Sequence, residues 1–209
     1  NLLLIVFLSG VCNLNAQHKK ESFEDDFYRA EKIFSQVYQD GKGEVLSNSK
    51  EGYSESLPIF LDLYAQDPEN RNLAFKIGVC HQSSRRLRAK AISYFEKAAS
   101  SVSEKYEGSS PEEVKAPFIT LKFLGDAYHL NHQFEKAINS YKRFLAISGN
   151  TKNSEKALIL ETDRKIQMCN TAIGLVAHPV KANIENLSDK VNSPYADYAP
   201  VLSADGKKL

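Results

Sequence analysis

The sequence predicts an all-α domain of repeated helix pairs, followed by the first strands of a β domain. Two observations predict the helical part. Apolar residues recur at helical spacing from Phe23 to about Val176, and the same order of residue types appears more than once in that stretch. A third observation predicts the β part, because the apolar period shortens from about 3.6 residues to about 2 after His178.

Residues 1–16 have the features of a signal peptide. Leu2–Leu8 is apolar throughout, and small and polar residues lead to Ala16, where we expect cleavage. The run is shorter than the roughly 20 residues that span a bilayer, so we expect no transmembrane segment in the mature chain. We therefore expect an exported protein of the periplasm, or of the periplasmic face of the outer membrane. Two alternatives remain open: a buried core segment, and a lipoprotein modified at Cys12, although Val11 is unusual before a lipidated cysteine.

The first helices of the domain lie between Phe23 and Pro68. An opening helix is expected from Phe23 to Gln39, and a second helix carries Tyr53, Ser56, Phe60 and Leu63, which together with Pro68 form a third copy of the repeated pattern described next. The second helix should end at Asp67-Pro68, because proline cannot continue a helix. Pro58 lies early in that helix and should fall in its first turn, where proline is tolerated.

Two later segments share one pattern. In each, a glycine on a first helix lies where the facing helix can approach closely, and Ala and aromatic residues line a second, antiparallel helix. The residues of the pattern are Gly78, Ala91 and Phe95 in the earlier copy and Leu124, Gly125, Tyr128, Ala137 and Tyr141 in the later one. Extra residues between the copies fall on Ser103–Lys115, a predicted loop, and Ser154–Val176 is a predicted capping helix.

This pattern resembles the tetratricopeptide repeat, a helix pair of about 34 residues with Leu-Gly, Tyr, Ala, Phe, Ala and Pro at fixed positions. The resemblance covers roughly Phe23 to Asn150, within a domain assigned to residues 17–177. It implies a superhelical solenoid of about three helix pairs with a capping helix.

Residues 178–209 are assigned to a linker and the start of a truncated β-propeller. Val180, Ala182 and Ile184 alternate with polar residues, and Asp205-Gly206 between apolar runs predicts a hairpin. The last ten residues resemble the first strand pair of a WD-repeat-like, TolB-type propeller blade. Signal peptide, tetratricopeptide repeats and such a propeller, in this order, are similar to the front of OmpA-family cell-envelope proteins. That resemblance implies a fragment of a longer protein, with peptidoglycan bound only through a missing C-terminal domain.

Composition and motifs favour binding over catalysis. The 209 residues hold 27 Lys and Arg against 26 Asp and Glu, so the basic excess of nucleic-acid-binding proteins is absent. No Gly-x-Ser-x-Gly elbow, His-Glu-x-x-His helix or phosphate-binding Gly-rich loop is present in the sequence. We therefore expect no enzyme, no cofactor and no metal.

Three weaker patterns each have a plain structural alternative. His129 and His132 have a spacing that suits metal ligands, but no third ligand accompanies them and a solvated turn is favoured. Cys80 and Cys169 could form a periplasmic disulfide, but their apolar helical faces favour buried free thiols. The only basic cluster, Arg85–Lys90, is more typical of a solvated turn than of an anion or nucleic-acid site.

The tetratricopeptide resemblance also implies a binding groove lined by the first helix of each pair. In that register the groove residues are Asn72, Phe75, Val79 and Gln82 of the earlier copy and Lys122, Asp126 and His129 of the later one. They suit an extended or helical peptide segment, and the alternative is ordinary surface. The expected function is a non-enzymatic scaffold that docks another envelope or secretion-system protein. Two alternatives are an accessory domain of an exported propeller-containing hydrolase, and a sensor with a small ligand in the propeller mouth.

Overall fold

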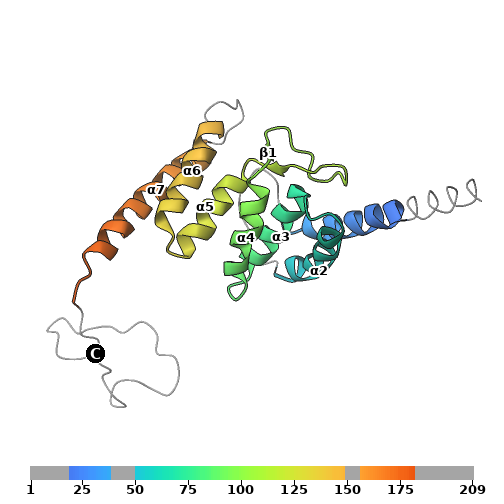
Figure 1. Ribbon diagram of the computed structural model, residues 1–209, viewed down its shortest axis with the longest axis horizontal. Helices are drawn as coiled ribbons and strands as arrows, with labels where there is room; N and C mark the ends of the chain where they lie inside the picture. The colour runs from blue at the N-terminus through green and yellow to red at the C-terminus, as the bar shows by residue number, and fades with distance from the viewer. Residues whose placement is uncertain (1–18, 39–49, 149–155, 182–209) are drawn as a thin grey trace, which may run out of the picture. The chain divides into compact units, whose positions relative to one another are not determined.

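A computed structural model describes residues 19–38, 50–148 and 156–181, which are mostly α-helical (Figure 1). The all-α prediction is confirmed for these residues. The helices, in chain order, are residues 19–34, α2 (Lys50–Gln66), α3 (Arg71–Ser83), α4 (Ala91–Ala98), α5 (Thr120–Leu130), α6 (Phe134–Ser148) and α7 (Lys156–Ala177). The short 3-10 helix η1 (Arg88–Lys90) precedes α4, and the strands β1 (Val102–Ser103) and β2 (Ala116–Pro117) pair in parallel.

The chain up to Gly174 forms one unit, and a second unit begins at Leu175. The predicted signal peptide and the predicted strands beyond residue 181 lie outside the described residues. Among the helices that the structure does describe, none combines the length and the apolar character that crossing a bilayer requires.

The turns between helices result from local side-chain chemistry. The helix α2 ends at Gln66, immediately before Asp67-Pro68 as predicted, and Asn70 caps the next helix by accepting a 3.0 Å hydrogen bond from the backbone N–H of Leu73. Between α5 and α6, His132 adopts a φ of 59°, a left-handed conformation that reverses the chain. Short turns of this kind place consecutive helices side by side, as Figure 1 shows for α5 and α6.

The position of Pro58 differs from the prediction. Because α2 includes Lys50, Pro58 lies in the interior of the helix and not in its first turn. The helix begins further upstream than the proline suggested, since the buried residues Tyr53 and Ser56 already belong to its packed face. A proline has no N–H, so the carbonyl oxygen of Ser54 lacks the helical hydrogen bond that residue 58 would otherwise donate.

All eight residues that carry the repeated pattern are buried, and the two glycines lie where the helices meet. A Cβ atom added at Gly78 would lie 2.5 Å from Cε1 of Phe95 on α4, and one added at Gly125 would lie 2.5 Å from Cδ1 of Tyr141 on α6. Real Cβ atoms do not approach neighbours that closely. The expectation that Gly78 and Gly125 are wedged between facing helices is confirmed, and the same contact recurs in α3–α4 and α5–α6.

A glycine substitution tests this packing directly. Gly78→Val should lower the free energy of unfolding by about 1–3 kcal/mol, because the fully buried Phe95 ring cannot move aside without disturbing the core. Gly174→Ala is the matched control, since no atom lies within 4 Å of the added Cβ and a small gain in helix propensity is expected. Urea unfolding followed by circular dichroism measures both. Equal stability of Gly78→Val and the parent chain would contradict the close packing.

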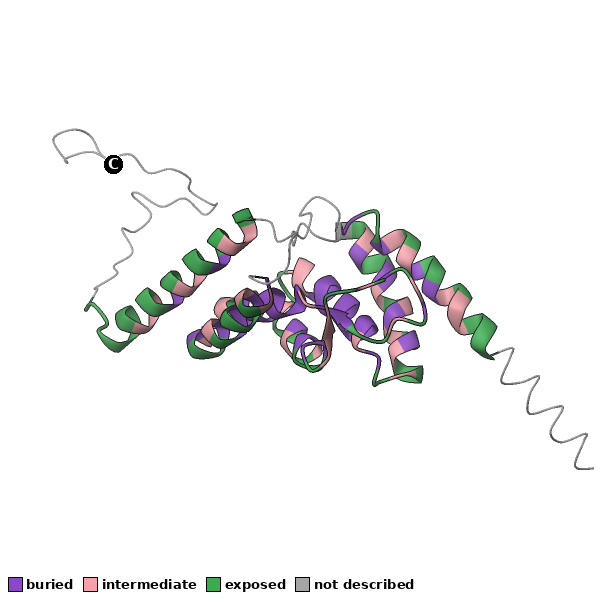
Figure 2. Cartoon of the chain, turned by 90° about the horizontal axis from the view of Figure 1, so that it is seen from above, coloured by how far each residue is buried: buried purple, intermediate pink, exposed green. Residues whose placement is uncertain are grey.

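Aromatic rings form the centre of the core between the helices. Phe75 on α3 lies 6.4 Å from Phe95 on α4 and 5.9 Å from Phe123 on α5, measured between ring centroids. Tyr128 on α5 also donates a 2.5 Å hydrogen bond to Glu96 on α4. Figure 2 shows the buried residues on the sides of the helices that face one another. Side chains of one helix pair therefore pack directly against side chains of the next pair.

The predicted loop insertion and the predicted capping helix are both present. The insertion packs on α3, and the inner side of the capping helix is buried. The insertion runs from β1 to β2 and contacts the start of α3, where the N–H of Arg71 donates to the carbonyl of Val114 at 2.8 Å. The helix α7 has Thr162 and Cys169 buried on its inner side, whereas most of its remaining length is exposed (Figure 2).

Candidate functional site

The α3 half of the predicted groove is closed. Asn72, Phe75 and Val79 have no exposed surface, so they cannot contact a partner in this conformation. Tyr106 of the insertion lies over them: its hydroxyl donates a 2.5 Å hydrogen bond to Oδ1 of Asn72, and its ring lies 6.3 Å from that of Phe75. The prediction of an open groove at these residues was therefore wrong, because the inserted loop folds back onto α3. Only Gln82, at the end of α3, keeps partial exposure.

The α5 half of the predicted groove is closed by α7 at Lys122 and Asp126, whereas His129 keeps partial exposure. Lys122, with a side chain only 4% exposed, contacts Asp126 at 3.1 Å and Glu161 of α7 at 3.3 Å. Lys165 of α7 contacts both Asp126 and Glu161 at 2.7 Å. The hydroxyl of Tyr141 donates a further 2.7 Å hydrogen bond to Asp126. Lys122 and Asp126 thus bind the capping helix and are not the partner-binding residues that the sequence predicted.

The neighbouring charges in this network shift the pKa values of its members. Burial alone would raise the pKa of Glu161, but the hydrogen bond from Lys165 and the charge of Lys122 hold it below its ordinary value. Burial alone would lower the pKa of Lys165, yet Asp126 and Glu161 raise it. Burial, and then the charge of Asp126, raise the pKa of Tyr141, so its hydroxyl remains a donor. Glu161 and Lys165 are therefore charged at neutral pH, and their contacts with Lys122 and Asp126 hold α7 against α5.

The histidines and cysteines do not converge on a reactive centre. His129 lies in the last turn of α5 and His132 in the α5–α6 turn, each with its ring 5.8 Å from that of Phe134. Within the described ranges, no three His, Cys, Asp or Glu side chains are grouped as metal ligands would be. Cys80 and Cys169 are both buried and free, and burial raises the pKa of the Cys80 thiol to about 12. Both behave as small apolar core residues, as their helical positions favoured.

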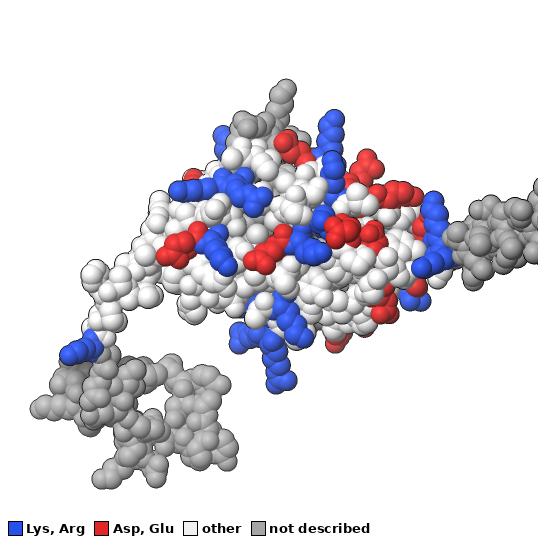
Figure 3. Space-filling model, in the orientation of Figure 1, with Lys and Arg blue, Asp and Glu red and all other residues white. Residues whose placement is uncertain are grey.

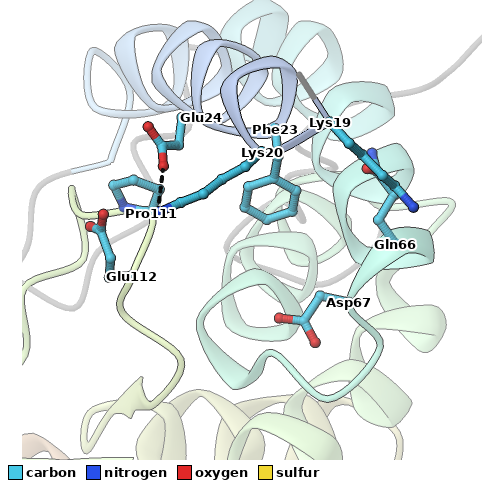
Figure 4. A pocket seen from close by; sticks show the side chains of 8 residues that line it. All are labelled: Lys19, Lys20, Phe23, Glu24, Gln66, Asp67, Pro111 and Glu112. Atoms are coloured by element: carbon cyan, nitrogen blue, oxygen red, sulfur yellow. Dashed lines mark ion pairs between the residues drawn. The ribbon is translucent and has the colours of Figure 1, made fainter. Parts of the chain in front are cut away.

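One open cleft, which we call the amino-terminal cleft, lies beside the first helix. It has a volume of about 410 Å³ and is lined by Lys19, Lys20, Phe23, Glu24, Gln66, Asp67, Pro111 and Glu112 (Figure 4). The Phe23 ring and Pro111 give it apolar walls, while charges of both signs lie around them, including a 3.5 Å ion pair between Lys20 and Glu24. Sequence reasoning missed it because its walls come from the first helix, the α2–α3 turn and the insertion, which are far apart in the chain.

A second open cleft, which we call the basic cleft, lies between α2 and the turn that comes after α3. Its volume is about 550 Å³. Leu57, Leu61 and Leu87 lie in its lining, and Arg85 and Arg86 stand at its edge. The sequence did signal this site through the Arg85–Lys90 cluster, but it gave no sign that apolar residues of α2 lie beneath that cluster.

Comparison with known proteins adds no family: no family model matches the chain, and no curated protein is significantly similar to it. The function of the chain must therefore be inferred from the geometry of the groove residues and of the two clefts.

Proposed function

We propose that this chain is the docking part of a non-enzymatic scaffold protein of the Gram-negative cell envelope. The observation that carries the proposal is the recurring contact of a first-helix glycine with an aromatic ring of the second helix, Gly78 with Phe95 and Gly125 with Tyr141. This is the packing that the tetratricopeptide resemblance implies, and repeats of that kind form rigid frames for binding other proteins.

In this proposal the partner binds at the outer clefts, because the insertion and α7 occupy the groove. A rigid frame with clefts that combine apolar walls and charged edges suits an interface whose apolar centre supplies affinity and whose charged edge supplies orientation. The partner is another envelope or secretion-system protein. Export to the periplasm, and association with peptidoglycan through a further domain, belong to the same proposal.

In vivo photo-crosslinking tests this function. A benzophenone amino acid replaces Glu112, which lines the amino-terminal cleft, and, in a control strain, Lys142, an exposed residue of α6. In the full-length protein of the source cell, the Glu112 position should give a discrete crosslinked protein, identified by mass spectrometry, and the Lys142 position should not. If several positions in both clefts give no crosslink above the Lys142 background, the docking role fails.

A further inference from the structure

The basic cleft has the size and lining of a binding site. Its volume of about 550 Å³ falls within the range of roughly 300–1,000 Å³ typical of ligand sites. Its apolar residues come from two places, with Tyr53, Leu57, Pro58 and Leu61 on α2 and Leu87 in the turn before η1. Leu57, Leu61 and Leu87 are half-buried, so they retain apolar surface that an apolar side chain of a partner can cover.

The edge of this cleft carries an unbalanced positive charge. Arg85 and Arg86 are exposed, and neither forms an ion pair with any residue that the structure describes. Arg88 and Lys90 follow in η1, while Glu51 is the one carboxylate among the residues that line the cleft. Figure 3 shows blue atoms without adjacent red ones at the lower edge, where Figure 1 places the turn before α4. Free guanidinium groups of this kind bind carboxylates with two parallel hydrogen bonds.

Together, these features identify the ligand class. We propose that the basic cleft binds an extended acidic segment of a partner protein, an inference that rests on the docking function proposed above. An apolar side chain of the segment covers Leu57 and Leu61, and acidic residues beside it bind Arg85 and Arg86. Binding to the cleft therefore requires apolar and acidic residues together, a requirement that charge alone would not impose.

Fluorescence anisotropy with the full 209-residue chain tests this assignment. The probe is a fluorescein-labelled peptide amide, Gly-Leu-Leu-Asp-Glu-Glu. Two comparison peptides replace either the acidic residues with Asn-Gln-Gln or the two leucines with serines. Saturable binding is expected for the first peptide, with dissociation constants at least about tenfold higher for each of the others, since either change removes a whole set of contacts.

Charge-reversed variants locate the site. The double variant R85E/R86E should weaken binding of the acidic peptide by at least about tenfold. The control K142E/R164E changes the net charge equally at exposed residues of α6 and α7 and should leave binding within about twofold, because distant surface charges are screened. Circular dichroism confirms that both variants are folded.

Three results overturn the assignment: no saturable binding of the acidic peptide, equal binding of the peptide without acidic residues, or equal weakening by both double variants. Binding to phosphatidylglycerol vesicles that requires Arg85 and Arg86, without peptide binding, would assign the cleft to a membrane surface instead. None of these results removes the docking function itself, which fails only if the crosslinking experiment at both clefts fails.

Discussion

Replacing Lys76 with methionine should lower the free energy of unfolding by about 3–5 kcal/mol, although the substitution keeps most of the side-chain volume. Lys76 on α3 is 2% exposed, and its Nζ atom lies 2.6 Å from Oε2 of Glu31 on the first helix. Its charge also lies 4.9 Å from the centre of the Phe34 ring. Removing the lysine leaves the Glu31 carboxylate, itself only 15% exposed, among apolar neighbours without its partner.

Two further variants separate this mechanism from general damage to the core. The double variant Lys76→Met with Glu31→Leu should recover most of the loss, because a buried ion pair is often replaceable by apolar residues of similar size. The variant Lys97→Met removes an exposed pair with Glu69 and should cost less than about 1 kcal/mol. Urea unfolding of the chain measures all three. A cost for Lys76→Met no larger than that for Lys97→Met would show that the buried pair contributes little.

Elements whose signal is local were predictable from the sequence. The apolar period located the helices, and the Gly78 and Gly125 positions could be inferred from the order of residue types within each segment. The capping helix was predicted from the apolar residues of one face, and Cys169 does lie buried on it. In each case the information lies within a stretch shorter than one helix pair.

Contacts between segments that are far apart in the chain were not predictable in this way. Phe75 and Asp126 occupy the groove side of their helices in the repeat register, and nothing in α3 or α5 indicates that Tyr106 or Lys165 covers them. The pairing of Lys76 with Glu31 is hidden for the same reason. One signal for the contact between α5 and α7 was present in the sequence. Lys122 and Asp126 on α5 are opposite charges four residues apart, and Glu161 and Lys165 on α7 are another such pair with the order of charges reversed.

The largest local change is expected at Asp126. Asp126→Ala removes the carboxylate that binds Lys122, Lys165 and the Tyr141 hydroxyl, and leaves the nearly buried Lys122 with Glu161 alone. We expect a loss of about 3–5 kcal/mol, most of it as release of α7 from the helices beneath it. Cys169 reports this release, because its side chain has no exposed surface while α7 is docked.

Thiol labelling resolved by peptide mass spectrometry distinguishes local release from unfolding of the whole domain. Labelling of Cys169 should accelerate by about a hundredfold or more in Asp126→Ala, since each 1.4 kcal/mol corresponds to about a tenfold change in the population of the open form. Cys80, buried between α2 and α3, should accelerate far less, and Asp163→Ala on the exposed side of α7 should change neither rate. Equal acceleration at both cysteines would mean that Asp126 supports the core as a whole. The predicted groove on α5 would then open only when the whole domain unfolds.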